Sequence, residues 1–442
     1  MTQAFSSLFV DLSSGKGSIF AEAGKGIPDI TPAALCSKPD GGVASASGVE
    51  NRSLLEELRM TDEETVIIGA GPAGLACAAA LRATGCRFIV LEATSRLGAS
   101  WRRHYDRLHL HTDKSHSALP GRPMPVDFPR YPSRLQVIDY LESYARENNL
   151  RILTNKTVAR VAKKTDWIVE TTGGDVFEAR AVVIATGLSR TPVRPYWAGQ
   201  NNFPGNIIHS SEYRNASALN ADRILVVGFG NSAGEIALEC AEAGLDVAMS
   251  VRGPVNVVPR EILGLPSATV AIAQQHFPPR LVDAVNAAIL RLRYGDIEKL
   301  GLKRSRQGPL TVMIEQGRTP LIDIGTIAKI RGGRIKVFPG IEMSQGANVF
   351  FVNDRSAEFD AIVLATGYRP SLETFLPDLT NRFPNAGKPA RDELQPGKDN
   401  LYFCGFNPAT TGLLRQIGIE ALQIAKSIAA TVRADLGSSG RG

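Results

Sequence analysis

The 442-residue chain has only five cysteines, and no two of them form a Cys-x-x-Cys pair. Cys36, Cys77, Cys86, Cys240 and Cys404 are an odd, scattered set. This argues against a disulfide framework, a zinc site and a dithiol redox centre. We therefore expect the protein to work in a reducing compartment, the cytoplasm.

Long apolar runs and concentrated charge are absent as well. No apolar run approaches the roughly 18 residues that a membrane-spanning helix requires. The net charge of +6 is spread along the sequence, without the basic face and reading motif that a nucleic-acid-binding protein needs. We expect neither a nucleic acid nor a membrane as a partner.

Residues 1–59 differ in composition from the rest of the chain. They are rich in Gly, Ser, Ala and Pro and show no sustained periodicity, so we predict a poorly ordered extension. They contain no basic stretch followed by an apolar one, which argues against a signal peptide. Met60 would suit the start of the folded part, and residues 433–442 are predicted to form a flexible tail.

A first glycine motif lies between two runs of different character. The β-branched run 65–68 ends directly at Gly69, and residues 75–82 favour a helix. Strand, tight turn and helix are what the Gly-x-Gly-x-x-Gly fingerprint requires to bind a pyrophosphate at a helix N-terminus. The next strand, 87–91, ends at Glu92, a carboxylate that suits a ribose with a free 2′-OH, as in FAD or NAD. The residues assigned to this first nucleotide site are Gly69, Gly71, Pro72, Ala73, Gly74 and Glu92.

A second glycine motif repeats this pattern. Strand 223–227 is followed by a glycine turn, and residues 232–241 are predicted to form the helix. The strand 245–250 has no acidic residue at its end and is followed by Arg252, which favours the 2′-phosphate of NADPH over NADH. The residues assigned to this second site are Gly228, Gly230, Asn231, Ser232, Gly234 and Arg252.

Three further segments resemble those of a known family. Residues 92–101, which end in Trp101, resemble the segment beside the flavin in monooxygenases with two dinucleotide-binding domains. Residues 105–111, Tyr-Asp-Arg-Leu-His-Leu-His, are similar to a run in the plant-type YUCCA flavin monooxygenases. The motif of Phe203, Gly205, His209 and Tyr213 fits the fingerprint of flavin-containing and Baeyer–Villiger monooxygenases.

The YUCCA resemblance extends from about residue 65 to about residue 430. Residues 258–261, 308–310, 319–325 and 329–337 also resemble stretches of those enzymes. Residues 407–412 depart from the plant pattern, and because they could line the substrate pocket, they leave the substrate open.

The resemblance implies an α/β fold with two Rossmann-like dinucleotide-binding domains. The FAD domain would comprise residues 60–192 and 350–432, with an NADPH domain, residues 193–349, inserted. Two near-repeats, 181–187 and 360–368, each a buried strand with an Ala-Thr-Gly turn, would mark the chain leaving and re-entering the FAD domain. The resemblance also places His209 near the domain junction and assigns four more residues to FAD: Trp101, His111, Thr186 and Gly187.

His109 and His111 lie two positions apart, so on a strand they would share a face. Apart from His116, no third ligand with a recognised spacing accompanies them, so no metal site is predicted.

The activity implied by the resemblance uses FAD, NADPH and O2. NADPH would reduce FAD, and the reduced flavin would form a C4a-peroxyflavin with O2. That adduct would attack the carbonyl of a 2-oxo acid such as indole-3-pyruvate, with loss of CO2. Because the cofactor carries the chemistry, no catalytic side chain is assigned, and the candidates near the flavin are Trp101, His111 and Asn231.

Other functions remain open at this point. Within the oxygenases, the alternatives are N- or S-hydroxylation and Baeyer–Villiger oxidation of a small organic substrate. An NADPH-dependent flavoprotein reductase would need a cysteine pair near the flavin, and a nucleotide-sensing protein would keep the fold without turnover. Residues 262–305 are predicted to be partly helical and either cover the substrate entrance or cap the NADPH domain.

Overall fold

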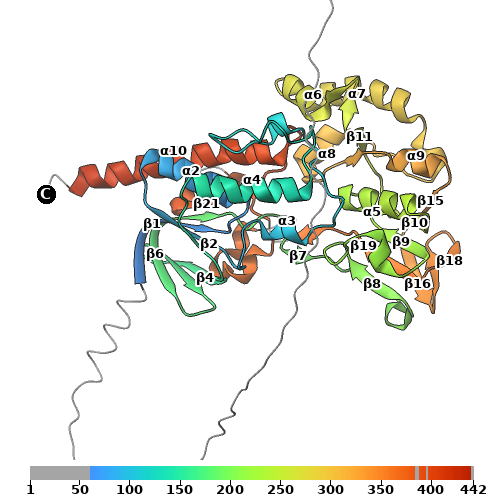
Figure 1. Ribbon diagram of the computed structural model, residues 1–442, viewed down its shortest axis with the longest axis horizontal. Helices are drawn as coiled ribbons and strands as arrows, with labels where there is room; N and C mark the ends of the chain where they lie inside the picture. The colour runs from blue at the N-terminus through green and yellow to red at the C-terminus, as the bar shows by residue number, and fades with distance from the viewer. Residues whose placement is uncertain (1–59, 384–387, 395–396, 440–442) are drawn as a thin grey trace, which may run out of the picture. The chain divides into compact units, whose positions relative to one another are not determined.

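The computed structural model describes residues 60–383, 388–394 and 397–439. The expectation of an extension over residues 1–59 therefore lies outside the described residues. The described part has a mixed α/β fold built around two sheets with parallel strands (Figure 1).

The first sheet contains seven strands of the described chain: β1 (Met60–Ile68), β2 (Phe88–Leu91), β3 (Ile152–Leu153), β4 (Val158–Lys163), β5 (Trp167–Thr171), β6 (Val176–Ile184) and β21 (Leu401–Phe403). Their order is β3-β2-β1-β6-β5-β4, and β21 also pairs with β6. The strands β3, β2, β1, β6 and β21 run parallel, whereas β4, β5 and β6 form an antiparallel meander. The predicted strand before Gly69 is thus the central β1.

Three helices cover one face of this sheet (Figure 1): α2 (Pro72–Thr84), α4 (Arg134–Glu147) and α10 (Leu413–Ser439). They share an apolar core with β1 and β6, and the alanines of α2 allow α10 to pack closely against it. Ser133 begins α4 with a capping box that involves Gln136. The prediction of a tail over residues 433–442 is wrong as far as Ser439, because α10 continues to that residue.

The second sheet is wholly parallel: β8 (Asn206–His209), β9 (Arg223–Val227), β10 (Asp246–Ser250), β15 (Ile335–Phe338) and β19 (Ala361–Leu364). Its order is β15-β10-β9-β19-β8. The helices α5 (Asn231–Glu242) and α9 (Thr326–Arg331) pack beside it. A small antiparallel sheet precedes β19: β16 (Ile341–Gln345), β17 (Asn348–Phe351) and β18 (Ser356–Glu358).

The position of β19 corrects the expected domain boundary. The sequence predicts that residues 350–364 belong to the returning FAD domain, but β19 pairs with β8 and β9 of the second sheet. The chain returns to the first sheet only after β19. Two short strands, β7 (Thr191–Pro192) and β20 (Tyr368–Arg369), mark the outgoing and returning crossings and pair antiparallel. Both crossings between the sheets therefore lie side by side.

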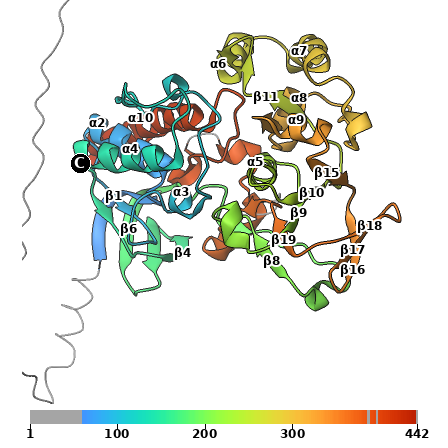
Figure 2. The ribbon, with the colours of Figure 1, turned by 45° about the vertical axis from the view of Figure 1, so that its right-hand side comes forward.

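A helical region, here called the cap and comprising residues 261–316, follows β10 and a short β11 (Val257–Pro259). It contains the hairpin β12 (Glu261–Ile262) and β13 (Leu265–Pro266), then α6 (Ser267–Gln274), α7 (Pro279–Tyr294) and α8 (Pro309–Gln316). Figure 2 shows α6 and α7 next to each other, and β14 (Leu321–Asp323) pairs with β11 below them. Asp283 of α7 fixes α8, because its carboxylate accepts hydrogen bonds from the backbone N–H groups of Leu310 and Thr311 at 3.0 and 2.9 Å.

The remaining regular elements are short: α3 (Ala99–Arg103) and the 3-10 helices η1 (Lys114–His116), η2 (Gln200–Asn202), η3 (Ala216–Leu219), η4 (Ile297–Leu300), η5 (Leu372–Thr374), η6 (Pro377–Arg382), η7 (Arg391–Leu394) and η8 (Lys398–Asn400). Among the described helices, none combines the length and apolar character needed to cross a membrane.

Candidate functional site

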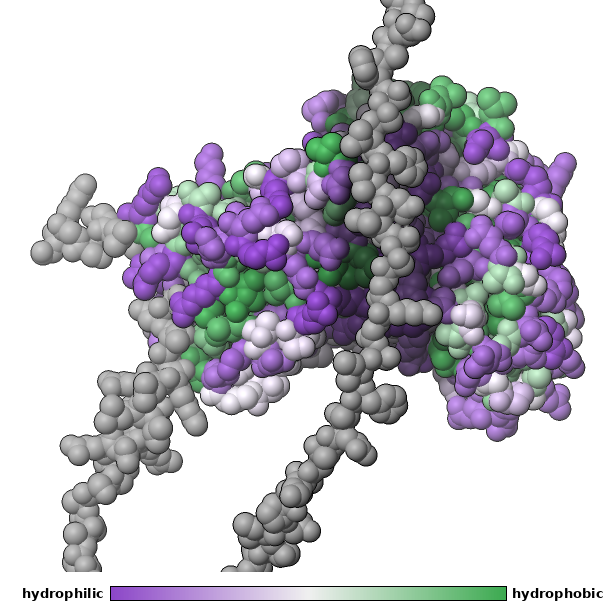
Figure 3. Space-filling model, in the orientation of Figure 1, coloured by the Kyte–Doolittle hydropathy of each residue, from purple (hydrophilic) through white to green (hydrophobic). Residues whose placement is uncertain are grey.

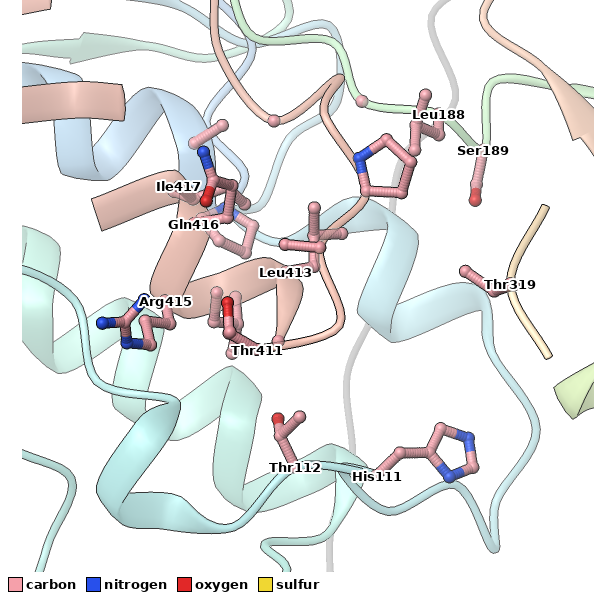
Figure 4. A pocket seen from close by; sticks show the side chains of 18 of the residues that line it. His111, Thr112, Leu188, Ser189, Thr319, Thr411, Leu413, Arg415, Gln416 and Ile417 are labelled. Atoms are coloured by element: carbon pink, nitrogen blue, oxygen red, sulfur yellow. The ribbon is translucent and has the colours of Figure 1, made fainter. Parts of the chain in front are cut away.

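A cavity of about 1110 Å³ connects the first glycine motif with the cap and the beginning of α10. Figure 4 shows part of its wall: His111 and Thr112 come from the loop after α3, Thr319 from the segment before β14, and Leu413 from the first turn of α10. The residues predicted from the sequence that line it are Gly69, Gly71, Pro72, Ala73, Glu92, Trp101, His111, Thr186, Gly187 and Asn231. Those that do not line it are Gly74, Gly228, Gly230, Ser232, Gly234, Arg252, Phe203, Gly205, His209 and Tyr213.

The first glycine loop is held by close backbone contacts. Gly69 has a φ of +106°, in the region that favours glycine. A Cβ at Gly74 would lie 1.8 Å from the carbonyl oxygen of Gly69, so only glycine lets α2 begin this close to β1. A Cβ at Gly71 would meet nothing within 4 Å, because Gly71 faces open space beside the cavity. A bulky anion can therefore approach the backbone at Gly71.

Glu92 is buried directly after β2, and both oxygens of its carboxylate accept hydrogen bonds. One oxygen accepts a hydrogen bond from the backbone N–H of Ala70 at 2.8 Å. The other accepts from the backbone N–H and the hydroxyl of Thr94, at 3.0 and 2.8 Å. These bonds tie the glycine loop to the strand that follows α2. The carboxylate is consequently positioned on the cavity wall by the protein itself.

The second glycine loop is built in the same way. Gly228 has a φ of +126°, and a Cβ there would lie 2.4 Å from the carbonyl oxygen of Ala365. At Gly69 the corresponding contact is with the carbonyl oxygen of Ala185, at 2.7 Å. Ala185 and Ala365 are the alanines of the two Ala-Thr-Gly turns. The two Ala-Thr-Gly turns therefore occupy equivalent positions in the two sheets. In each sheet the turn follows the strand that lies beside the glycine loop.

Two residues of the second motif have contrasting surroundings. The side-chain oxygen of Asn231 accepts a hydrogen bond from the backbone N–H of Ile322 at 2.8 Å, which joins α5 to β14 at the cavity wall. Arg252 follows β10 and is exposed. No carboxylate among the described residues pairs with its guanidinium.

His111 links the two sheets through α5. Its Nε2 lies 3.1 Å from a carboxylate oxygen of Glu235, which lies on α5 one turn after Asn231 and is only 3 % exposed. Burial and the nearby Glu235 raise the pKa of Tyr105 well above its usual range, so its phenol stays protonated. Burial and then the charge of Arg103 lower the pKa of His104, which also lines the cavity and is therefore neutral.

The motif around His209 lies beside the two crossings. The imidazole is fully buried, with Nε2 3.1 Å from the carbonyl oxygen of Gly367 and Nδ1 3.0 Å from the hydroxyl of Ser211. Burial lowers the pKa of His209 and keeps it neutral. A Cβ at Gly205 would lie 1.9 Å from the carbonyl oxygen of Asp360, so this position needs glycine to let β8 approach. The motif thus shapes the edge of the second sheet and lies outside the cavity.

Sequence reasoning missed most of the cavity's apolar wall. The cap provides residues such as Ile262, Ala271, Val282 and Met313, and the loop before α10 provides residues 408–412. The open question about residues 262–305 is answered in part, since several of them line the cavity. No periodicity within the cap indicated which side of α6 or α7 would face inward.

No cysteine among the described residues lines the cavity. Cys77 and Cys404 are buried in the core of the first sheet as free thiols. A hydrogen bond with Cys77 and burial raise the pKa of Cys404 well above its usual range, so this thiol is not a ready nucleophile.

Comparisons with known proteins agree with this architecture. Residues 66–261 match the family described as pyridine nucleotide-disulphide oxidoreductase. The chain is 36 % identical over 387 residues to the probable indole-3-pyruvate monooxygenase YUCCA3 of Arabidopsis thaliana, covering 82 % of this chain and 86 % of that protein. It is also 36 % identical over 387 residues to the indole-3-pyruvate monooxygenase YUCCA1 of Oryza sativa subsp. japonica, covering 86 % and 95 %. A flavin-containing monooxygenase from Stenotrophomonas maltophilia shares the fold, with a TM-score of 0.65 at 20 % identity over 84 % of this chain and 100 % of that one.

Proposed function

This chain belongs to the family of the YUCCA-type flavin monooxygenases, and we propose that its substrate is a 2-oxo acid such as indole-3-pyruvate. It is an NADPH-dependent flavin monooxygenase that uses FAD. The observation that carries the proposed substrate is the identity of 36 % across most of the chain to enzymes named for indole-3-pyruvate. The reaction would convert the 2-oxo acid, O2, NADPH and a proton into CO2, water, NADP+ and an acid one carbon shorter.

The residues around the first glycine loop fit FAD. The backbone at Gly71 is open, α2 has no acidic residue in its first turn, and its N–H groups can receive a pyrophosphate. Glu92 would accept hydrogen bonds from the ribose hydroxyls, which its preset position favours. Thr186 and Gly187, at the end of β6, would lie along the same cofactor, with Trp101 and His111 nearer the flavin ring.

The second loop fits NADPH. Gly230 also faces open space, α5 has no acidic residue in its first turn, and Ser232 lies on that turn. Arg252 is an exposed cation without a carboxylate partner among the described residues. Its guanidinium is therefore free to bind a 2′-phosphate. Asn231 lies where the second loop meets the cavity and would contact the nicotinamide end.

Bound FAD, once reduced by NADPH, supplies the activation of O2 that side chains cannot provide. The protein's own part is to exclude water and to hold the substrate. Apolar side chains of the cap and of the first turn of α10 line the cavity and would enclose the substrate. His104, which lines the cavity beside Trp101 and Arg103, has a lowered pKa and stays neutral there. Arg415, on the first turn of α10, also lines the cavity and would bind the carboxylate of a 2-oxo acid (Figure 4).

The test measures products of a single turnover. Holoenzyme reduced anaerobically with NADPH is mixed with ¹⁸O2 and indole-3-pyruvate, and CO2 and the labelled acid are quantified. We expect one CO2 and one acid carrying a single ¹⁸O atom per NADPH, with the other oxygen atom in water. Labelled product from an amine, a thioether or a ketone, with none from 2-oxo acids, would refute the proposed substrate and favour N- or S-hydroxylation or Baeyer–Villiger oxidation.

A further inference from the structure

The outer face of α7 carries an apolar stripe that nothing in the described chain covers. Leu281, Val285, Ile289 and Leu292 are 54 %, 56 %, 40 % and 90 % exposed. Their spacing of four, four and three residues places them on one side of the helix. Soluble proteins scatter single apolar residues over their surface, so a continuous stripe of four indicates a binding face.

The fold does not require this stripe. On the opposite side of α7, Asp283 and Tyr294 are buried, and α7 packs there against α8. Val282 is buried at the edge of the stripe, next to Ile289. Asp283 fixes that side through its hydrogen bonds to the N-terminus of α8. The stripe can therefore be changed without disturbing the contacts that hold the cap.

Positive charge borders the stripe on both sides. Arg280 and Arg291 lie on one side and Arg293 on the other, given 100° per residue along a helix. All three are exposed, and none forms a salt bridge with a described residue. Residues 267–306 contain seven arginines and lysines and three acidic residues, of which Asp283 is buried.

Exposed apolar side chains continue on the neighbouring loops of the cap. Leu263 at the tip of the β12–β13 hairpin is 98 % exposed, and Phe277, just before α7, is 58 % exposed at the rim of the cavity that it helps to line. Leu263 also has a φ of +51°, an uncommon backbone conformation for a leucine. Figure 3 shows hydrophobic side chains at the top of the molecule, where Figure 1 places α6 and α7.

We propose that α7 and these loops dock the cap on the surface of a membrane rich in anionic lipids. An apolar stripe bordered by arginines is the pattern of a helix that lies in the interface plane, with its side chains among the acyl chains and its cations at the headgroups. A second copy of the chain fits less well. A stable dimer buries about 800 Å² on each partner, and a stripe one helix wide would bring two rows of arginines together.

The docking would be a surface contact and not a span, and it revises the expectation that the protein has no membrane partner. Val282 and Asn286 of the same helix line the cavity. A cap seated on lipid would therefore place the cavity wall next to the phase in which apolar compounds dissolve.

Vesicle co-sedimentation of the FAD-loaded full chain tests this inference independently of the substrate. The vesicles are phosphatidylcholine alone or with about one third phosphatidylserine. We expect the protein to bind the mixed vesicles, and the binding to weaken as salt is raised. The triple variant Arg280→Gln, Arg291→Gln, Arg293→Gln should bind roughly 100-fold more weakly, and Leu281→Gln with Leu292→Gln at least about 10-fold more weakly.

A matched control is available on other helices. Leu135 of α4 and Leu422 of α10 are 59 % and 55 % exposed, so Leu135→Gln with Leu422→Gln removes similar apolar surface elsewhere and should leave binding unchanged. All variants should keep their FAD content and melting temperature. Absence of binding to the mixed vesicles would overturn the proposal, and so would equal losses in the two double-leucine variants. A wild-type dimer that Leu281→Gln with Leu292→Gln dissociates, without any lipid binding, would assign the stripe to a second copy instead.

Discussion

The two glycine loops are constructed alike, but the residues that follow them differ. Gly69 and Gly228 both have positive φ, and both pack against the carbonyl oxygen of an Ala-Thr-Gly alanine. Glu92 is buried and accepts three hydrogen bonds, whereas Arg252 is exposed and has no carboxylate partner among the described residues. If these residues bind the two cofactors as proposed, the first site is organised before its ligand arrives, and the second would order its cation when the ligand binds. This difference suits a resident flavin and a nicotinamide that exchanges at each turnover.

The largest expected contrast is between Gly74→Ala and Gly234→Ala. At Gly74 the new methyl group would lie 1.8 Å from a backbone oxygen, whereas at Gly234 it would lie 2.6 Å from the side-chain Cδ1 of Leu321, which can rotate away. We expect Gly74→Ala to lose bound FAD and about 3 kcal/mol of unfolding free energy, and Gly234→Ala to keep FAD and lose about 1 kcal/mol. Flavin absorbance and thermal unfolding measure both. Equal losses would show that the backbone contact at Gly74 is no stricter than the side-chain contact at Gly234.

Charge removal at the two sites sharpens the same comparison. Arg252→Ala should raise the KM for NADPH about 10- to 100-fold while leaving FAD content unchanged, because a charge-assisted contact to phosphate is lost. Its preference for NADPH over NADH should fall by a similar factor. Glu92→Ala should instead weaken FAD binding about 10- to 100-fold and destabilise the protein before any ligand is added, since the N–H of Ala70 loses its partner. An Arg252→Ala enzyme with unchanged cofactor preference would contradict the assignment of the second site.

A third contrast concerns the residue that follows the third glycine of each motif. Leu75 is buried in the core of the first sheet, whereas Glu235 faces His111 across the two parts of the protein. Glu235→Gln should slow flavin reduction by NADPH about 10-fold at constant FAD content, because His111 loses its carboxylate partner. Anaerobic stopped-flow measurement gives this rate. The control is Glu239→Gln on the next turn of α5, which removes a carboxylate charge but keeps an oxygen that can accept the hydrogen bond from the hydroxyl of Tyr213, and should leave the rate nearly unchanged.

The smallest effect is expected at His209, which has no counterpart beside the first loop. Burial lowers the pKa of His209 in the folded protein below the ordinary 6.5. As the pH falls through that value, the unfolded chain therefore binds more protons than the folded protein. The stability that His209 contributes is therefore complete above about pH 6.5 and decreases on acidification. His209→Gln should flatten the dependence of the unfolding free energy on pH in this window. An unchanged slope would mean that other groups cause the acid sensitivity.

Local sequence predicted the parts of the fold that depend on local interactions. The run 223–227 matches β9 at both ends, because its β-branched residues are bounded by a polar residue and a glycine. The boundary at residue 350 was wrong because 181–187 and 360–368 have the same local pattern, and only strand pairing assigns one to each sheet. The predicted tail begins too early, at residue 433, because extending an existing helix costs little free energy, even through weak helix formers.

Contacts between distant residues could not be predicted in this way. His111 and Glu235 each fit a family motif, but nothing in either motif indicates that one faces the other. The cavity wall of the cap depends on how α6, α7 and α8 pack, and their apolar residues are divided between the cavity and the outer surface. Tertiary packing determines both features.

The paired crossings β7 and β20 have a consequence for protein engineering and for the evolution of the fold. Because Thr191 and Arg369 are neighbours in one antiparallel ribbon, the two ends of the intervening segment meet at a single point. A segment whose ends meet can be inserted into or removed from a host chain with little loop-closure entropy. The part that carries the second sheet and the cap is thus a cassette, and a short turn between residues 191 and 369 would reconnect the first sheet without stretching it. Exchange of this cassette between relatives offers a direct way to transplant nicotinamide preference and cap surface together.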